Sequence, residues 1–263
     1  MIPQNNWQSY PLPDDAPHRF RFGNLLLWAK TAHDEIWLDT RYLPNEEPYD
    51  PSLAEPAAEE FAWKRWTIPA RSKEIVFRPL FPDLPVLVTP EYPFRMLPGV
   101  HTTIYVRVPV WVEILIGKYP VTAIPSVVLS KTWFGTFLEG ELCYWISSGT
   151  RKAIEPDPER PFLAICPIFI KNDSEAELQV EKICLRVEQL ELYAQAEQLY
   201  SNETRVTYRG IGSTSEVRTG RGAPRVAADA KRIAPARNPV DRSISARTFS
   251  TIKDFSGFGL FNR

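Results

Sequence analysis

Histidine and cysteine are the residues whose spacing would reveal a metal or nucleophilic site, and in this sequence they are scattered. His18, His33 and His101 show no HxxxH or HExxH spacing, so we expect solvated loop histidines. The three cysteines contain no CxxC pair, and the sequence has no GxGxxG, GxxxxGK[ST] or GxSxG motif. We therefore predict no metal, no cofactor and no catalytic residue.

Two carboxylates come closest to a catalytic spacing. Glu139 and Glu141 are two residues apart, so an extended backbone would place them on one face, as acid/base pairs of glycosidases require. They flank Gly140, and acids beside a turn glycine are usually solvated. Cys143 or Cys166 would need a histidine partner in space to act as a nucleophile. The sequence favours a protein that is not an enzyme.

Aromatic side chains offer a binding chemistry instead, because the chain holds eight tryptophans and ten tyrosines. Trp111, Trp133 and Trp145 fall in or near predicted strands. Exposed rings of this kind stack on sugars or anchor protein interfaces. In the alternative interpretation, a second sheet or an N-terminal hairpin covers them.

The strand that carries Trp111 is the most regular segment of the chain, "TIYVRVPVWVEILI". Every even position from 104 to 116 is a β-branched apolar residue, which predicts a strand with one face in the core. Arg107, Trp111 and Glu113 lie on the other face, and Pro109 interrupts the hydrogen-bond ladder, which favours a sheet border where partners dock. A membrane span is excluded, since the period is two and each charge would cost roughly 2.5–3.5 kcal/mol near a bilayer centre.

The elements around this strand predict an all-β fold. Twenty-five prolines and twelve glycines divide the chain into short segments rich in β-branched and aromatic residues. We expect an antiparallel β-sandwich, Ig-like or jelly-roll-like, with an N-terminal hairpin region and an extended basic C-terminal arm. Residues 20–43 should form the hairpin, turning near His33. Pro167 predicts a bulge or an edge, and a switch of apolar phase near Glu188 or Gln189 predicts a β-bulge, with a helix as the alternative.

Charge divides the chain into a body and a tail. Residues 1–217 carry 21 basic and 29 acidic side chains, whereas residues 218–263 carry 10 basic and 3 acidic ones. We expect one β-rich domain over 1–217, in which 1–70 hold the hairpin region and an acidic loop and 71–217 form the sandwich core. Residues 218–263 should be a basic flexible tail that contacts a partner, and its candidate contact residues are Arg232, Phe258 and Phe261.

Three cysteines, an odd number, favour a reducing compartment, although a Cys166–Cys184 bridge stays open. The N-terminal segment has no basic region followed by an apolar stretch, so it is not a signal peptide. Cytoplasmic localisation is the expectation.

Several segments together resemble a known family: "RPLFPDLPVLVTPEYPFRMLPGVHTTIYVRVPVWVEI", "LSKTWFGTFLEGELCYWISSGTRK", "CPIFIKNDSEAELQVEKICLRV" and "NETRVTYRGIG". They resemble the uncharacterised prokaryotic family known as domain of unknown function 432, over roughly residues 20–217. The resemblance implies no assigned activity and no catalytic residue. It also implies that some relatives are encoded near small-conductance mechanosensitive channels. The basic tail looks like an extension beyond the shared region.

The leading functional hypothesis is a non-enzymatic intracellular interaction or accessory protein, a subunit or regulator of a larger assembly. Its partner would be another protein or a second copy of the chain, bound through the C-terminal arm. The alternatives are a sugar-binding or sugar-processing sandwich and a self-assembling structural protein. Nucleic-acid binding is disfavoured because the positive charges of the tail are spread singly, and the sequence identifies no small-molecule ligand.

Overall fold

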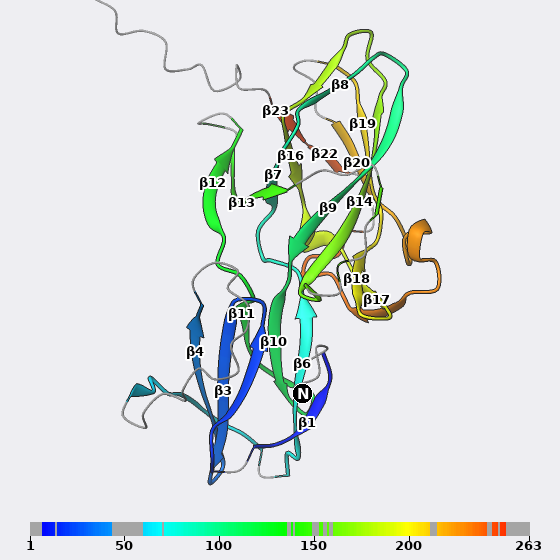
Figure 1. Cartoon of the computed structure of the whole chain (residues 1–263). Helices are drawn as coiled ribbons and strands as arrows, with labels where there is room; N and C mark the ends of the chain where they lie inside the picture. The colour runs from blue at the N-terminus through cyan, green and yellow to red at the C-terminus, as the bar shows by residue number, and fades with distance from the viewer. Residues whose placement is uncertain are drawn as a thin grey trace, which may run out of the picture. The chain divides into compact units, whose positions relative to one another are not determined.

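A computed structural model describes residues 7–13, 15–43, 60–69, 71–135, 138, 140–148, 153–154, 157, 160–210, 215–240, 244–246 and 248–250. The chain divides into two compact units. Unit 1 comprises Met1–Leu80, Pro109–Val128 and Glu159–Phe162, and unit 2 comprises Phe81–Val108, Leu129–Pro158 and Leu163–Arg263. Strands build both units, which confirms the all-β prediction (Figure 1). No helix in the described part of the chain is long and apolar enough to cross a membrane.

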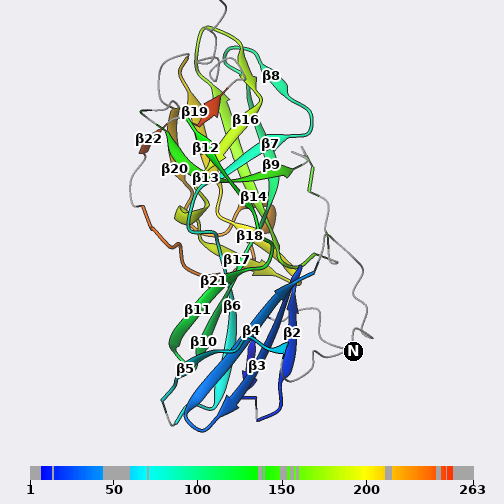
Figure 2. The same ribbon diagram turned by 90° about the vertical axis from the view of Figure 1, so that its left-hand side faces the viewer.

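Unit 1 is a sandwich of two four-stranded sheets, ordered β1-β6-β10-β11 and β2-β3-β4-β5. Alternate residues of both sheets meet in one core, in which Leu27 and Ile36 of one sheet join Phe77 and Ile114 of the other. Figure 2 shows β3 and β4 beside β10 and β11. The strands are β1 (Ser9–Pro11), β2 (His18–Phe22), β3 (Leu25–Ala32), β4 (Glu35–Tyr42), β5 (Lys64–Thr67), β6 (Glu74–Leu80), β10 (Trp111–Ile116) and β11 (Tyr119–Pro125).

The predicted N-terminal hairpin is present as β3 and β4, which pair from Leu25↔Tyr42 to Ala32↔Glu35. Its two-residue turn holds His33 at φ 54°, the left-handed conformation that such turns need. The predicted acidic loop lies mostly outside the described residues.

Unit 2 contains a five-stranded sheet ordered β12-β13-β7-β16-β23, a larger sheet around β14, and the two-stranded ribbon β8-β15. The larger sheet is ordered β21-β17-β18-β14-β19-β20-β22, with β9 also on β14. Its elements are β7 (Val86–Pro90), β8 (Phe94–Met96), β9 (His101–Pro109), β12 (Ser130–Phe134), β13 (Glu141–Ser148), β14 (Leu163–Asn172), β15 (Leu178–Val180), β16 (Lys182–Leu185), η2 (Val187–Gln189), β17 (Leu192–Gln195), β18 (Gln198–Ser201), β19 (Thr204–Tyr208), β20 (Ser215–Thr219), η3 (Arg225–Ala227), β21 (Lys231–Ala234), β22 (Ile244–Ala246) and β23 (Phe249–Ser250).

The sheets of unit 2 are mixed rather than purely antiparallel. β13 pairs with β7 in parallel, and β14 pairs in parallel with both β18 and β19. β14 changes partner within its length, since Ile165 pairs with β18 and Ile168 with β19. Pro167, which cannot donate to a ladder, lies at this change of partner, so the proline predicted as a bulge or an edge marks a partner switch.

The segment at 103–116 is split between the two units. All seven even positions are buried, as predicted, but β9 ends at Pro109 and β10 begins at Trp111. β9 pairs with β14 in unit 2, and β10 lies between β6 and β11 in unit 1. The sequence predicted one strand near a sheet border, whereas β10 is a central strand.

Near residue 188 the chain forms a turn of 3-10 helix, η2, in place of the predicted β-bulge. This turn separates β16 from β17, which belong to different sheets. The phase switch in the sequence therefore reflects a change of sheet.

Residues after 217 differ from the expected free tail. β20 pairs with β19, β21 with β17 and β23 with β16, so strands as far as Ser250 belong to the sheets of unit 2. Ala234 and Thr248 are each 2% exposed. The buried positions in this segment are filled by small and apolar residues that are dispersed among basic ones. The prediction of a free tail used the net charge of the segment, which does not reveal such residues.

Candidate functional site

The β12–β13 hairpin presents large apolar side chains to solvent. Trp133 and Leu142 are directly opposite each other in its register and are 46% and 41% exposed. Leu138, in the connection between the two strands, is 89% exposed. Since β12 is the edge strand of its sheet, the hairpin combines a sheet edge with an apolar surface. We call Trp133, Leu138 and Leu142 the hairpin surface.

Trp145 is also exposed but lies on the opposite face of the hairpin. It is directly opposite Ser130, and the residues of β13 alternate between faces, so it does not share the face of Trp133. Its Nε1 donates to Thr89 Oγ1 at 3.0 Å. Trp111 belongs to unit 1 and is only partly exposed. The three tryptophans proposed as a sugar platform do not form one.

The polar residues predicted to contact a partner from the 103–116 segment are instead held in ion pairs. Glu113 Oε2 lies 2.6 Å from Arg78 Nη2, and the glutamate side chain is 13% exposed. Arg107 Nη1 lies 3.6 Å from Asp157 Oδ2, and both side chains are less than one-fifth exposed. These charges neutralise each other within their own units, which leaves little of them for a partner.

The tail residues chosen as contacts have different outcomes. Arg232, on β21, is 62% exposed and donates to Glu191 Oε1 at 2.8 Å. This glutamate also accepts a 2.5 Å hydrogen bond from Tyr193. Burial, together with this hydrogen bond, raises the pKa of that tyrosine to about 12. Phe258 and Phe261 lie outside the described residues.

Of the two carboxylates predicted as a possible catalytic pair, only Glu141 can be placed, because Glu139 lies outside the described residues. Glu141 accepts a hydrogen bond from Arg186 Nη2 and lies 3.6 Å from Cys184 Sγ. Within the described ranges, no three His, Cys, Asp or Glu side chains are grouped in a way that could hold a metal ion.

Comparison with known protein families gives one result. The model of the family described as protein of unknown function (DUF432) matches residues 6–253. The chain belongs to this family. Neither the curated proteins nor the solved structures contain a match to the DUF432 chain.

The extent of the match corrects one expectation about the DUF432 chain. The shared region was predicted to end near residue 217, with the basic segment as an extension beyond it. The match runs on to residue 253 and therefore includes β21 to β23. The basic segment up to that point is part of what the family shares.

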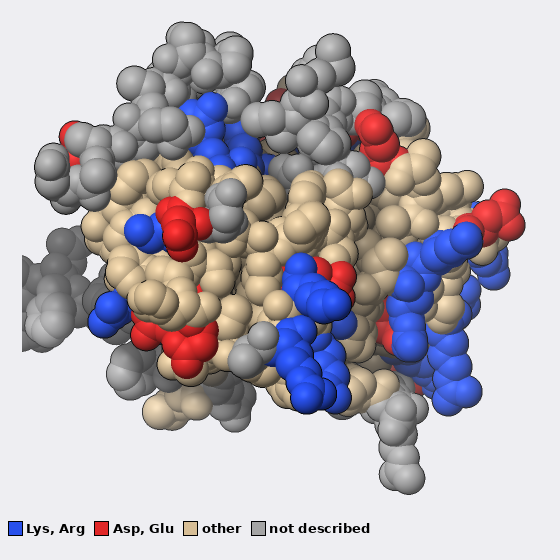
Figure 3. Space-filling model, turned by 90° about the horizontal axis from the view of Figure 1, so that it is seen from below, with Lys and Arg blue, Asp and Glu red and all other residues tan. Residues whose placement is uncertain are grey.

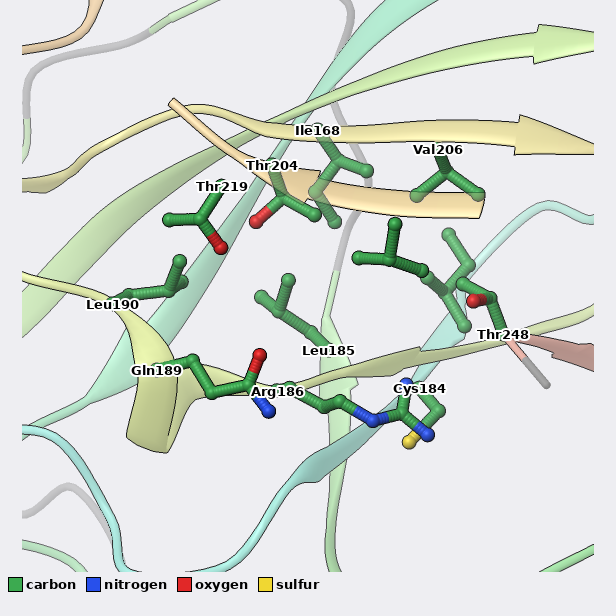
Figure 4. A pocket seen from close by; sticks show the side chains of 12 residues that line it. Ile168, Cys184, Leu185, Arg186, Gln189, Leu190, Thr204, Val206, Thr219 and Thr248 are labelled. Atoms are coloured by element: carbon green, nitrogen blue, oxygen red, sulfur yellow. The ribbon is translucent and has the colours of Figure 1, made fainter. Parts of the chain in front are cut away.

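A pocket of the DUF432 chain lies within unit 2, beside η2 (Figure 4). Leu185 points toward Thr204 and Ile168, whereas Cys184 and Arg186 lie together on the other side of the strand. The cavity measures about 10 Å3, which is room for one water molecule. Its size excludes a metabolite in this conformation.

The surface of the DUF432 chain is charged in patches. Viewed from below, Lys and Arg side chains gather in separate patches, with Asp and Glu beside them and uncharged surface between (Figure 3). The acidic balance of residues 1–217 therefore does not produce a uniformly acidic surface on this side of the molecule.

Proposed function

We propose that this DUF432 protein is a non-enzymatic interaction or accessory protein that contacts a protein partner through the hairpin surface. The observation that carries the proposal is the exposure of Trp133, Leu138 and Leu142 on an edge hairpin. Burying one such side chain contributes about 1.5–3 kcal/mol, and tryptophan is among the commonest energetic anchors of protein interfaces. The three together would supply a large part of the affinity of a specific complex.

A sugar-binding function is less well supported. The sugar platform predicted from the sequence needed its tryptophans on one exposed surface, and Trp133 and Trp145 occupy opposite faces of the hairpin. Contact through the C-terminal arm also loses support, because β21, β22 and β23 pair with other strands of unit 2. The hairpin surface replaces the arm as the proposed contact.

We further propose that the protein works in a reducing, intracellular compartment. Its three cysteines are all free and buried, although Cys143 and Cys184 lie close together. An oxidising compartment favours disulfides in secreted proteins.

Site-specific photo-crosslinking in the cells that make the protein tests the proposed contact. A photoreactive amino acid at Leu138 should give a discrete crosslinked protein, which a Trp133→Ser substitution in the same chain should abolish. Tyr92 is the matched control position, since it is 76% exposed and lies outside the hairpin. The proposal fails if position 138 gives no crosslink, or if positions 138 and 92 give the same products.

A further inference from the structure

The strand β12 has one edge with which no described strand pairs. It is the first strand in the order β12-β13-β7-β16-β23, so β13 pairs with one of its two edges only (Figure 1). Backbone N–H and C=O groups along the edge of a sheet can pair with an added extended chain. Trp133 belongs to this strand and is 46% exposed. The hairpin surface therefore lies beside an open sheet edge.

The length of β12 suits pairing with a second copy of itself. When two identical edge strands meet at a two-fold axis perpendicular to the sheet, they run antiparallel, and one residue lies opposite its own copy. Thr132 is the middle residue of the five in Ser130–Phe134, so a register centred on Thr132 pairs all of them. The two threonines are then directly opposite each other, which is a favourable cross-strand pair.

The charge on β12 favours the same register. Lys131 and Trp133 are both exposed and lie on one face of the strand. With Thr132 at the axis, each lysine is opposite the Trp133 ring of the other copy, where its ammonium group is attracted to the ring. A register centred on Lys131 would place two ammonium groups opposite each other, which is unfavourable. Lysine on an edge strand hinders pairing with most strands, so Lys131 selects this pairing.

We propose that two copies of the chain associate through β12 and join their five-stranded sheets into one continuous sheet. The inference rests on the proposed function, because it names a second copy as the protein that the hairpin surface contacts. The Trp133 side chains of both copies then lie on one face of the joined sheet. They are diagonal neighbours across the axis, which is close enough for large side chains to touch.

Disulfide trapping of the full chain tests the register. Thr132→Cys should give a disulfide-linked dimer, because Cα atoms of directly opposite residues lie about 4.5–5.5 Å apart, within the range of a disulfide. The variant also carries Cys143→Ala, since Cys143 is directly opposite Thr132 within the chain and would capture the new thiol. Cys166 and Cys184 are buried. Ser130→Cys, also with Cys143→Ala, is the matched control and should not crosslink, because the two copies of residue 130 would lie roughly 13 Å apart along the strand.

Sedimentation equilibrium measures the association itself. The wild type should have the mass of two chains. Trp133→Ser should raise the dissociation constant at least about a hundredfold, because it removes an anchor from each copy. Trp145→Ser is the matched control, since Trp145 is 44% exposed but lies on the opposite face of β13, away from the open edge. It should leave the dissociation constant unchanged, and circular dichroism should show that both variants are folded.

A monomeric wild type overturns the proposal, as does a dimer that Trp133→Ser does not weaken. Equal crosslinking at positions 130 and 132 also overturns it, because another register or surface would then join the copies. The proposed function has a separate test, since the photo-crosslink from Leu138 does not depend on which protein is the partner. A photo-crosslinked product whose mass is not that of two chains would support that function and overturn the second copy as the partner.

Discussion

At the scale of single residues, the polar side chains that alternate with buried β-branched ones find partners inside their own unit. Glu113 is directly opposite Arg78 across β6 and β10, and both Nε and Nη2 of the arginine contact its Oε2. Charged side chains on a central strand are partly buried by the neighbouring strands. Each of them therefore needs a side chain of opposite charge in contact with it. The pair therefore neutralises two partly covered charges within one sheet.

Glu113→Gln should lower the free energy of unfolding by about 1–2 kcal/mol, because it replaces a charge-assisted hydrogen bond at a mostly buried position. Urea denaturation measures the loss. Glu177→Gln is the matched control, since Glu177 pairs with Arg95 across exposed positions and should cost less than about 1 kcal/mol. Equal losses in the two variants would contradict the assignment.

Glu188 should make the free energy of unfolding depend on pH. Burial raises the pKa of this carboxyl from its ordinary value near 4.5 to about 7, and Arg186 only partly opposes the rise. The folded state therefore holds the proton more tightly than the unfolded state. Its contribution to stability is greatest below pH 4.5 and is lost as pH rises to about 7.

Glu188→Gln should remove this dependence. Relative to wild type, the variant should gain on the order of 3 kcal/mol in the free energy of unfolding between pH 4.5 and pH 8. Urea denaturation at a series of pH values checks the sign as well as the size. A difference between the two proteins that stays constant with pH would show that the carboxyl does not titrate in this window.

At the scale of elements, alternation in the sequence identified which side chains are buried but not which strands they meet. The even positions of 104–116 are all buried, as their parity indicates, because parity depends only on the local backbone. The break between β9 and β10 at Val110, the parallel strand pairs and the Cys143–Cys184 contact depend on strand order, which long-range packing decides. In the sequence, Pro109 and Pro167 predicted a sheet border, a bulge or an edge. Both residues lie where the chain changes its neighbouring strands.

The turn between β2 and β3 shows how strongly an element can depend on one glycine. Gly23 has φ +60°, and a Cβ there would lie 3.0 Å from the Phe162 ring. Gly23→Ala should therefore cost about 2–3 kcal/mol, part from the left-handed backbone and part from the contact with Phe162. Thermal and urea unfolding measure the cost.

Gly99→Ala separates the two contributions, since Gly99 has φ +73° with nothing within 4 Å of the added Cβ. It should cost about 1 kcal/mol, the backbone contribution alone. If both variants lose the same amount, contact with Phe162 has no energetic role.

At the scale of the whole molecule, the C-terminal strands are part of the fold. A chain that ends at Val217 loses β21, β22, β23 and the last two residues of β20. It should lack the cooperative unfolding transition of unit 2 and should be cleaved by protease at concentrations that leave the full chain intact. A chain that ends at Ser250 retains every described strand and should resist like the wild type; equal resistance of the Val217 chain would contradict this.

The division into two units was not visible in the sequence, since composition changes only near residue 217 and the boundaries fall within runs of strands. Between Leu80 and Leu163 the chain crosses from one unit to the other five times. No single cut can release either unit as one continuous segment, so a fragment taken from one uninterrupted stretch of this chain cannot contain one whole unit without part of the other. The family region, residues 6 to 253, accordingly includes segments of both units.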